Sequence, residues 1–346
     1  MLLKSLLDRA RKGLRSVLQG VTAGRLWKII LLPNIASEST THYITVVVMI
    51  RNEGPYLKEW LDFHIALGVT RFILYDNGST DHTVRVCEPY IRAGLVTLVP
   101  WANFSVWFNH QRGAYAHALA NFGTRTTWMG FFDIDEFMVP VAARSLTDIL
   151  QPREHLPVLL VAGVNFGTSG HAVKPDGGVI RNYRMGVPMH VQRRHRELIN
   201  TKCFVRPQCV EAVISLHWFR IRGDKAVGYT EHSKPIYGRP CTAGDQLSVD
   251  VIRYNHYFTR SREEFEHKIL GPDARGPLWY AARADKLRMF DLIESLVQED
   301  RVVERLANEL SLTRPQRECD RNSVDAVHST REPSNDESLP SQLNDN

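Results

Sequence analysis

The sequence lacks several features that would place it in common classes of protein. Its five cysteines are odd in number, widely spread and never form a CxxC pair, which argues against a zinc knuckle or a disulfide framework and favours a reducing compartment. No run of about 18 apolar residues occurs, so we expect no membrane-spanning helix. None of the 14 histidines belongs to an HExxH pattern, so a zinc hydrolase is not indicated.

The chain also has little net charge for its length. The net charge is only +5 over 346 residues, and a nucleic-acid-binding protein would show a dense basic stripe, so nucleic acid is not an expected partner. Hydrophobic residues at 43% and charged residues at 23% are ordinary for a globular protein. A chain of this length can bury a sizeable core, as one large domain or one domain with appendages.

The two ends of the chain differ from its middle. Residues 1–42 form a basic, amphipathic segment without the apolar block and cleavage site of a signal peptide. It either packs on its own domain or a second subunit, or makes peripheral membrane contact through residues 1–30. We therefore expect a cytoplasmic protein, with the inner face of the membrane as the open alternative. Residues 313–346 hold few apolar side chains and are predicted to be a disordered polar tail.

Between these ends, apolar strands alternate with helical patterns. Strands are predicted over 43–50, 71–76, 94–100 and 127–135. Helices are predicted from Pro55 to Gly68, after a cap at Ser79 or Thr80, and over 109–123. This alternation predicts an α/β fold, with a mostly parallel central sheet and helices on both faces.

After Pro140 the alternation fades. A strand leads into a Gly-rich loop over 157–171, and short strands with long loops follow to about residue 260. A further helix is predicted from Ser261, because Glu264 follows at capping-box spacing. The globular domain is thus expected to span residues 43–312.

Polar side chains follow three of the predicted strands. Arg51, Asn52 and Glu53 follow the first strand, Asp76 and Asn77 the second, and two aspartates the fourth. Because ligands of open α/β sheets bind beyond the carboxyl ends of the strands, we expect a site at this edge.

The stretch FFDIDEFMVP sets three acids into an otherwise apolar run. In an extended segment residues two apart point to the same side, so Asp133 and Asp135 would face one ligand while Ile134 packs behind them. Glu136 is expected to point away from Asp135 and to play a supporting role. Oxygen ligands suit Mg²⁺ or Mn²⁺, which also bind substrate phosphates. The alternative is a strand end where two aspartates meet solvent, since a lone DxD is a weak signal.

Longer motifs surround these acids. They are NEGPYLKEW from Asn52, GVTRFILYDNGSTDHT from Gly68, DIDEF from Asp133, FGTSGH at 166–171, NTKCFVRP at 200–207 and NHYFTRSREEF at 255–265. In this order they resemble glycosyltransferase family 92 and its bacterial relatives in the family 2-like group, over roughly residues 43–270. The resemblance implies a GT-A fold, with a nucleotide-sugar-binding half at 43–140 and an acceptor half with C-terminal helices at 141–312.

The resemblance also implies an activity. The implied activity is transfer of a sugar from a nucleotide-sugar, with UDP-galactose as the favoured donor. The implied acceptor is a glycan or a lipid-linked glycan, and the reaction would invert the anomeric carbon. By matching positions, Asp133, Asp135 and His256 would form the catalytic centre that holds Mn²⁺ or Mg²⁺ on the diphosphate. The nucleotide-sugar would be bound by a wider set of residues: Arg51, Asn52, Glu53, Asp76, Asn77, Ser79, Gln111, His171 and Lys202.

Some of these roles have alternatives. The catalytic base is expected to be Glu231 or Asp245, although either could be a solvated loop acid. His171 either contacts a ligand or caps a turn. His217, beside Trp218, is predicted to be a core histidine.

Other functions also stay open. A nucleotidyltransferase would show a Gly-rich phosphate loop after the first strand, where this chain has only Gly54. A phosphohydrolase would place its acids after the first strand. The non-enzymatic alternative is a silent carbohydrate- or nucleotide-binding module, which would have no use for a metal pair.

Overall fold

The computed structural model describes residues 30–33, 35, 41–102, 110–270 and 283–309, all within one compact unit that ends at Leu312. Most of the predicted N-terminal segment and the predicted polar tail lie outside the described residues. Among the described residues, no helix has the length and apolar character needed to cross a membrane.

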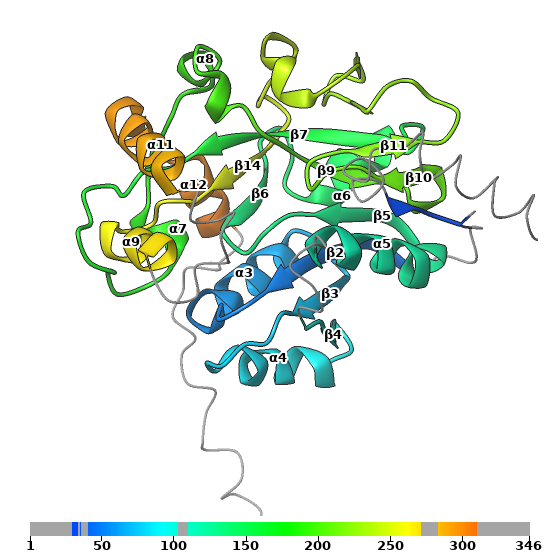
Figure 1. Ribbon diagram of the computed structural model, residues 1–346, viewed down its shortest axis with the longest axis horizontal. Helices are drawn as coiled ribbons and strands as arrows, with labels where there is room; N and C mark the ends of the chain where they lie inside the picture. Colours follow the sequence, from blue (N-terminus) through cyan, green and yellow to red (C-terminus); the bar gives the residue numbers. More distant parts are fainter. Residues whose placement is uncertain (1–29, 34, 36–40, 103–109, 271–282, 310–346) are drawn as a thin grey trace, which may run out of the picture. The chain divides into compact units, whose positions relative to one another are not determined.

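A large sheet runs through the unit (Figure 1). Its first half is parallel, in the order β4-β3-β2-β5, with β2 at His42–Ile50, β3 at Arg71–Asp76, β4 at Val96–Pro100 and β5 at Thr126–Phe131. Strand β9 (Thr201–Val205) then pairs antiparallel with both β5 and β7 (Val158–Asn165). Parallel and antiparallel strands therefore meet at β9, close to the end of β5.

The far half of the sheet brings a distant segment next to the acids. Strand β14 (Ile252–His256) runs parallel to β7 and antiparallel to β6 (Glu136–Pro140). In that register His256 is paired with Glu136 on one side and with Asn165 on the other. Strands β12 (Gly228–Tyr229) and β13 (Pro235–Ile236) complete this edge.

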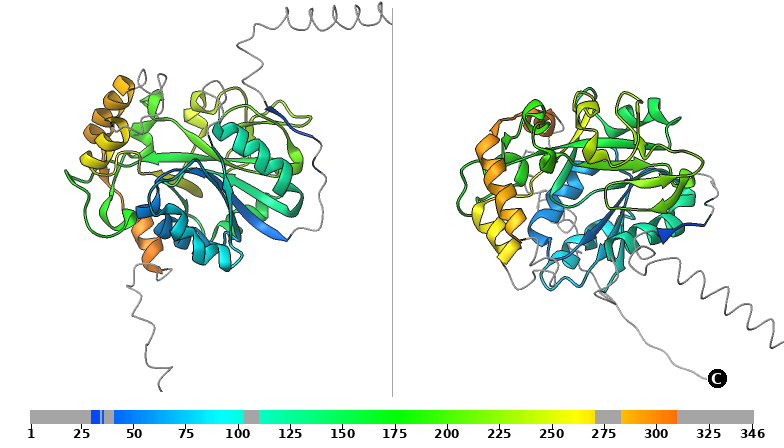
Figure 2. Two further views of the ribbon diagram at one scale, coloured as in Figure 1. Left: turned by 60° about the horizontal axis from the view of Figure 1, so that its bottom comes forward. Right: turned by 45° about the horizontal axis from the view of Figure 1, so that its top comes forward.

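Helices cover both faces of the sheet (Figures 1 and 2). Val46 and Val48 of β2 join one core cluster with Trp60 of helix α3 (Gly54–Ala66), and helix α4 (Thr83–Arg92) packs beside α3. Val47 points the other way and joins a second cluster with residues of helix α5 (His110–Phe122). The two-residue period of the strand explains this division, and the predicted α/β fold is confirmed.

The remaining elements are mostly short. They are β1 (Ile30–Leu31), α6 (Leu146–Leu150), α7 (Val179–Asn182), β8 (Met185–Gly186), α8 (Met189–Gln192), β10 (Val210–Val213), β11 (Phe219–Ile221), α9 (Arg262–Leu270), α11 (Arg283–Leu296), β15 (Gln298–Glu299) and α12 (Val302–Glu309). Phe265 and Phe290 pack α9 against α11 in a small separate core. Ser261 and Glu264 form the predicted capping box, since each side chain accepts the backbone N–H of the other.

Two local predictions are wrong. Helix α4 begins at Thr83, with His82 at the N-cap position and no cap from Ser79 or Thr80; the N–H of Thr83 donates instead to Asp81 at 2.9 Å. Strand β5 ends at Phe131, so the following acids are not extended.

Candidate active site

The loops after β2 and β3 are joined to each other at the carboxyl edge of the sheet. Asn52 has a positive φ of 54°, a conformation that asparagine tolerates better than most residues. Its side-chain oxygen accepts the N–H of Thr80 at 2.8 Å, while its own N–H donates to Ser79 Oγ at 3.0 Å. Asp76 accepts the N–H of Ser79 at 3.1 Å. The predicted nucleoside-binding residues of these two loops therefore lie together.

Two other residues of these loops have partners further away. Asn77 donates to the carbonyl of Trp101 at 2.7 Å, which fixes the loop after β3 to the end of β4. Glu53 lies 3.7 Å from the guanidinium of Arg260, and that guanidinium covers the ring of Tyr56 at 3.5 Å. The nucleoside loops are thereby tied to the segment between β14 and α9.

Asp133 and Asp135 lie in a turn that closes when the N–H of Glu136 donates to the Asp133 carbonyl at 3.0 Å. Ile134 is buried behind them, as predicted. The two aspartates have different partners, however. Asp133 accepts from Gln111 at 2.7 Å and from Lys202 at 2.8 Å, whereas Asp135 accepts from Lys268 at 2.6 Å. The expectation of an extended strand at these two residues is thus wrong, because they lie in a turn.

Glu136 also differs from its prediction. Its carboxylate accepts the N–H of Asp133 at 2.9 Å and lies 3.1 Å from the buried ammonium of Lys202. It does not point away from Asp135, because both carboxylates approach the ring of His256. Glu136 therefore belongs to the same group of side chains as the two aspartates.

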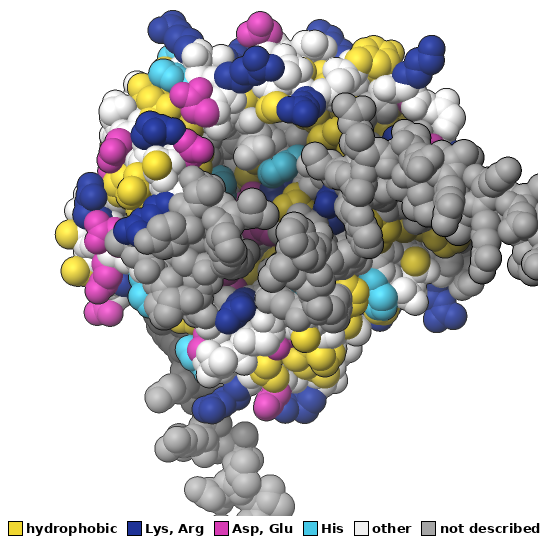
Figure 3. Space-filling view, viewed as in Figure 1, with side chains coloured by type: hydrophobic (Ala, Val, Ile, Leu, Met, Phe, Trp, Pro, Cys, Tyr) yellow, Lys and Arg dark blue, Asp and Glu magenta, His cyan; other side chains and the backbone are white. Residues whose placement is uncertain are grey.

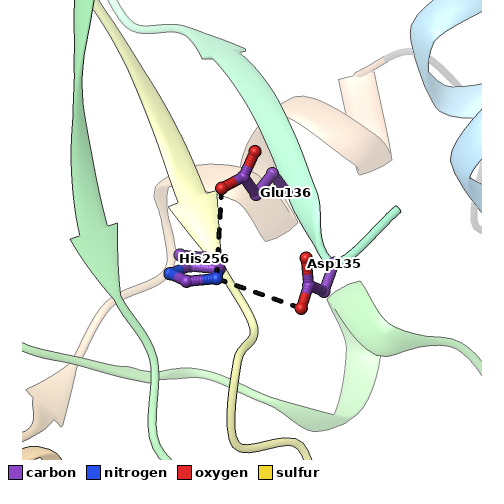
Figure 4. Close-up of side chains that lie close together, drawn as sticks. All are labelled: Asp135, Glu136 and His256. Carbon is purple, nitrogen blue, oxygen red and sulfur yellow. Dashed lines mark ion pairs between the residues drawn. The ribbon is translucent and has the colours of Figure 1, made fainter. Parts of the chain in front are cut away.

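The acidic cluster, which we define as Asp133, Asp135, Glu136 and His256, combines the turn before β6 with the end of β14. Figure 4 shows Asp135 and Glu136 both directed toward one ring nitrogen of His256. Nε2 of His256 lies 3.9 Å from Asp135 Oδ2 and 4.0 Å from Glu136 Oε1. These three residues offer ligand atoms that all lie within 4.8 Å of one another. Two carboxylates and an imidazole are a suitable donor set for Mn²⁺.

A hydrogen-bond network fixes the proton on His256. Asn165 donates through Nδ2 to Gln192 at 2.9 Å and to the carbonyl of Leu198 at 3.0 Å. This leaves Asn165 Oδ1 facing Nδ1 of His256 at 3.2 Å. An amide oxygen only accepts, so Nδ1 carries the proton and Nε2 presents its lone pair to the two carboxylates. When Glu136 is ionised, three acceptors consequently face one another, as in a site that binds a cation.

The pKa values of the cluster follow from burial and neighbouring charges. Burial lowers the pKa of His256 to about 4 against the opposing effect of Asp135, so the ring is neutral near pH 7. Burial raises the pKa of Glu136 to about 8, because Asp133 and Asp135 add to it and Lys202 only partly opposes it. Burial would also raise the pKa of Asp135, but Lys268, His256 and Arg260 hold it well below its usual range.

Lys202 is the buried counterion of the cluster. Burial would lower the pKa of its ammonium, but Asp133 and Glu136 outweigh burial and hold the pKa above its ordinary value. Removing one partner of a buried ion pair leaves an uncompensated charge. Lys202 therefore keeps two of the acids in place.

A family profile decides the classification. The profile described as "Glycosyltransferase family 92" matches residues 49–240, more than half of the chain. The chain belongs to glycosyltransferase family 92. This is a family of enzymes, and the observed α/β architecture is the one expected of its GT-A fold.

Named relatives support the same family. A glycosyltransferase family 92 protein of Oryza sativa subsp. japonica is 29% identical over 182 residues, which are 51% of this chain and 30% of that protein. The galactan beta-1,4-galactosyltransferase GALS2 of Arabidopsis thaliana is 28% identical over 100 residues, covering 27% of this chain and 19% of that protein. The match thus spans a third or less of these relatives' own length.

Among solved structures, S. aureus TarS 1-349 aligns over 72% of this chain and 70% of that chain, with 15% sequence identity and a TM-score of 0.35. A TM-score this low supports no functional comparison.

Other predicted site residues of this family 92 chain lie outside the acidic cluster. Glu231 is buried and accepts the N–H groups of Asp250, Val251 and Ile252 at 2.9, 3.1 and 2.8 Å. Such a fully bonded carboxylate holds a loop in place, which argues against its predicted role as a base. Asp245 is exposed on a single 3-10 turn.

His171 lies in its predicted loop. Its Nε2 is 3.3 Å from the carbonyl of Asn182, and its ring meets the edge of Tyr183. This geometry favours the turn-capping alternative for His171.

Sequence reasoning missed three residues. Lys268 of α9 reaches Asp135 across 133 positions of sequence, and no local pattern could have indicated that contact. Glu136 is part of the DIDEF motif, but its carboxylate was wrongly expected to point away from Asp135. His217 is not a fully buried core residue, because it lines a hollow next to the cluster.

Proposed function

We propose that this family 92 chain is a metal-dependent glycosyltransferase that moves a sugar from a nucleotide-sugar to a glycan acceptor. The proposal depends on one observation, namely the lone pair of His256 Nε2 facing the carboxylates of Asp135 and Glu136. Once Glu136 is ionised, these buried acceptors repel each other unless a cation lies between them, whereas at lower pH a proton on Glu136 takes that place. A divalent cation would relieve this repulsion, and it would also bind the diphosphate of a donor.

Asp133, Asp135 and His256 are the proposed metal ligands, and Glu136 joins them as a candidate from its position. When bound, Mn²⁺ or Mg²⁺ supplies Lewis-acid stabilisation of the negative charge on the departing diphosphate. Lys202 holds Asp133 and Glu136 by ion pairs of 2.8 and 3.1 Å. Its positive charge also lies where a diphosphate would benefit from it.

The joined loops after β2 and β3 are the proposed nucleoside site. The residues that would contact the nucleoside there are Arg51, Asn52, Glu53, Asp76, Asn77 and Ser79. Gln111 and Lys202 would complete the donor site, whereas His171 is assigned to turn capping. The mutual hydrogen bonds of Asn52 and Ser79 support this assignment, because a rigid pair of loops loses little entropy on binding.

UDP-galactose is the first donor to test, since two relatives are named as galactan beta-1,4-galactosyltransferases. A glycan is the first acceptor class. A lipid-linked glycan, reached through membrane contact of residues 1–30, is the second. Inversion at the anomeric carbon is the expected outcome.

The test is calorimetric titration of UDP with and without Mn²⁺, followed by release of galactose from UDP-galactose. We expect tight UDP binding that requires Mn²⁺, together with measurable sugar release. UDP binding that is indifferent to Mn²⁺ in the wild type would contradict the proposal. Binding without release from UDP-galactose, UDP-glucose or any other nucleotide-sugar would favour the silent binding module.

A further inference from the structure

A hollow of about 780 Å³ opens beside the acidic cluster. Its described lining consists of Arg112, Asn200, Thr201, Ile214, Ser215, His217, Trp218, Arg239, Pro240 and Cys241. Figure 3 shows histidine, acidic and basic side chains gathered in a recessed area at the middle of one face. We call the hollow defined by the lining residues given above the cationic hollow, because its described lining contains two arginines and no carboxylate.

Two pairs of consecutive residues connect the hollow to the acidic cluster. Gln111 donates to Asp133 at 2.7 Å, and its neighbour Arg112 lines the hollow. Lys202 donates to Asp133 at 2.8 Å, and its neighbour Thr201 lines the hollow. Consecutive side chains of a strand point to opposite faces, but the charges of Lys202 and Asp133 both act on His217 of the hollow. The hollow and the proposed donor site therefore lie close together near β9, as an acceptor site must lie near the reacting carbon.

His217 has the geometry of a proton acceptor in this hollow. Its Nδ1 lies 3.0 Å from the carbonyl oxygen of Thr201, which can only accept a hydrogen bond. Nδ1 therefore carries the proton, and Nε2 keeps a free lone pair. Burial, helped by Lys202, lowers the pKa of His217 to about 4, so the ring is neutral near pH 7. A base needs an orienting partner of this kind.

The remaining lining indicates which acceptor would fit. The guanidinium groups of Arg112 and Arg239 match a carboxylate or phosphate group. Trp218 also lines the hollow, and an aromatic ring suits the apolar side of a sugar ring. An anionic saccharide uses both the arginines and the aromatic ring of this lining, whereas a neutral glycan uses only the ring.

We propose that the cationic hollow binds an acceptor sugar that carries an anionic group, and that His217 Nε2 takes the proton of the attacking hydroxyl. The inference rests on the proposed function. The acceptor oxygen forms the new bond to the anomeric carbon, and the bond from that carbon to the diphosphate oxygen breaks. The bonding electrons leave with the diphosphate, while the hydroxyl proton moves to His217.

The first experiment tests the base with water as the acceptor. We expect His217→Ala to lower the rate of UDP-galactose hydrolysis about 100-fold. Added imidazole should restore much of the rate, which a purely structural defect would not allow. Calorimetric binding of UDP with Mn²⁺ should persist in the variant. Failure of the wild-type protein to bind UDP with Mn²⁺ would refute the proposed function. Unchanged hydrolysis in His217→Ala would refute only the role of His217.

The second experiment tests the acceptor class. Tetragalacturonate serves as the anionic probe and β-1,4-galactotetraose as the neutral one. We expect wild-type protein to bind tetragalacturonate, and Arg239→Gln to weaken that binding about tenfold. Arg222→Gln is the matched control, because Arg222 is an exposed arginine outside the hollow. Preference for the neutral probe, no binding of either probe, or equal effects of the two variants would each overturn the anionic assignment.

Discussion

The acidic cluster and the cationic hollow adjoin at β9, yet they have opposite chemistry. In the cluster, two carboxylates and the lone pair of His256 face one another. In the hollow, the described lining includes two arginines and His217, whose Nε2 carries a lone pair. Both histidines are kept neutral by burial and oriented through Nδ1, so the difference lies in their neighbours. One neutral histidine is thereby suited to bind a cation and the other to accept a proton.

The strongest test of this comparison removes a carboxylate, a group that the cluster has and the described lining of the hollow lacks. We expect Asp135→Asn to lower UDP-galactose turnover about 1000-fold, because stabilisation of the leaving diphosphate is worth several kcal/mol. Steady-state kinetics at saturating Mn²⁺ measures the change. Asp245→Asn is the control, since Asp245 is an exposed loop acid, and it should retain turnover. Equal loss in both variants would remove the special role of the cluster.

Lys202 provides a second test of the comparison between the acidic cluster and the cationic hollow, because its buried positive charge lies near both. We expect Lys202→Met to lower the free energy of unfolding by about 3–5 kcal/mol, since Asp133 and Glu136 lose their counterion. Urea denaturation measures this, and Mn²⁺ should restore part of the loss by replacing the charge. Lys225→Met, at an exposed position, should change stability little. A Lys202 variant as stable as the Lys225 variant would mean that the ion pairs contribute nothing.

Glu231 extends the comparison to an acid that belongs to neither region. We expect Glu231→Gln to cost about 1–3 kcal/mol of stability, because the amide cannot accept every N–H of Asp250, Val251 and Ile252. Mn²⁺-dependent UDP binding should be unchanged. Thermal unfolding and calorimetry together check this. Full stability with abolished turnover would instead restore Glu231 as the base.

The smallest effect concerns pH. Burial raises the pKa of Glu136 to about 8, so protons compete with a cation for its carboxylate below that pH. As pH rises toward 8, Glu136 loses its proton and the Mn²⁺ affinity should increase, by at most about tenfold per unit, before it levels off. Calorimetry in buffers with different ionisation enthalpies should also detect proton release on binding. An affinity independent of pH between 6 and 8 would exclude Glu136 as a ligand.

The sequence predicted the first half of the fold well, because its strands are short apolar runs with clear ends. The strand predicted at 71–76 is found at Arg71–Asp76. The acidic turn was harder to predict, since the two-residue rule applies only to extended chain and β5 ends at Phe131. The contact of His256 with Glu136 depends on β14 pairing with β6, which no local pattern encodes. Only the family resemblance pointed to His256.

His217 shows the other limit of sequence reasoning. A histidine beside a tryptophan is typical of a core, but His217 is only partly buried. Its function depends on the Thr201 carbonyl, which lies 16 positions away in sequence, and on the hollow in front of it. Such long-range proximity emerges only in the folded chain.

The most direct test of the account is electron spin echo spectroscopy of Mn²⁺ bound with UDP to ¹⁵N-labelled protein. We predict a coupling to an imidazole nitrogen that disappears in His256→Gln and persists in His217→Gln, together with a coupling to phosphorus. Mn²⁺ that binds UDP without any coupling to a histidine nitrogen, or with a coupling that survives in His256→Gln, would contradict the account.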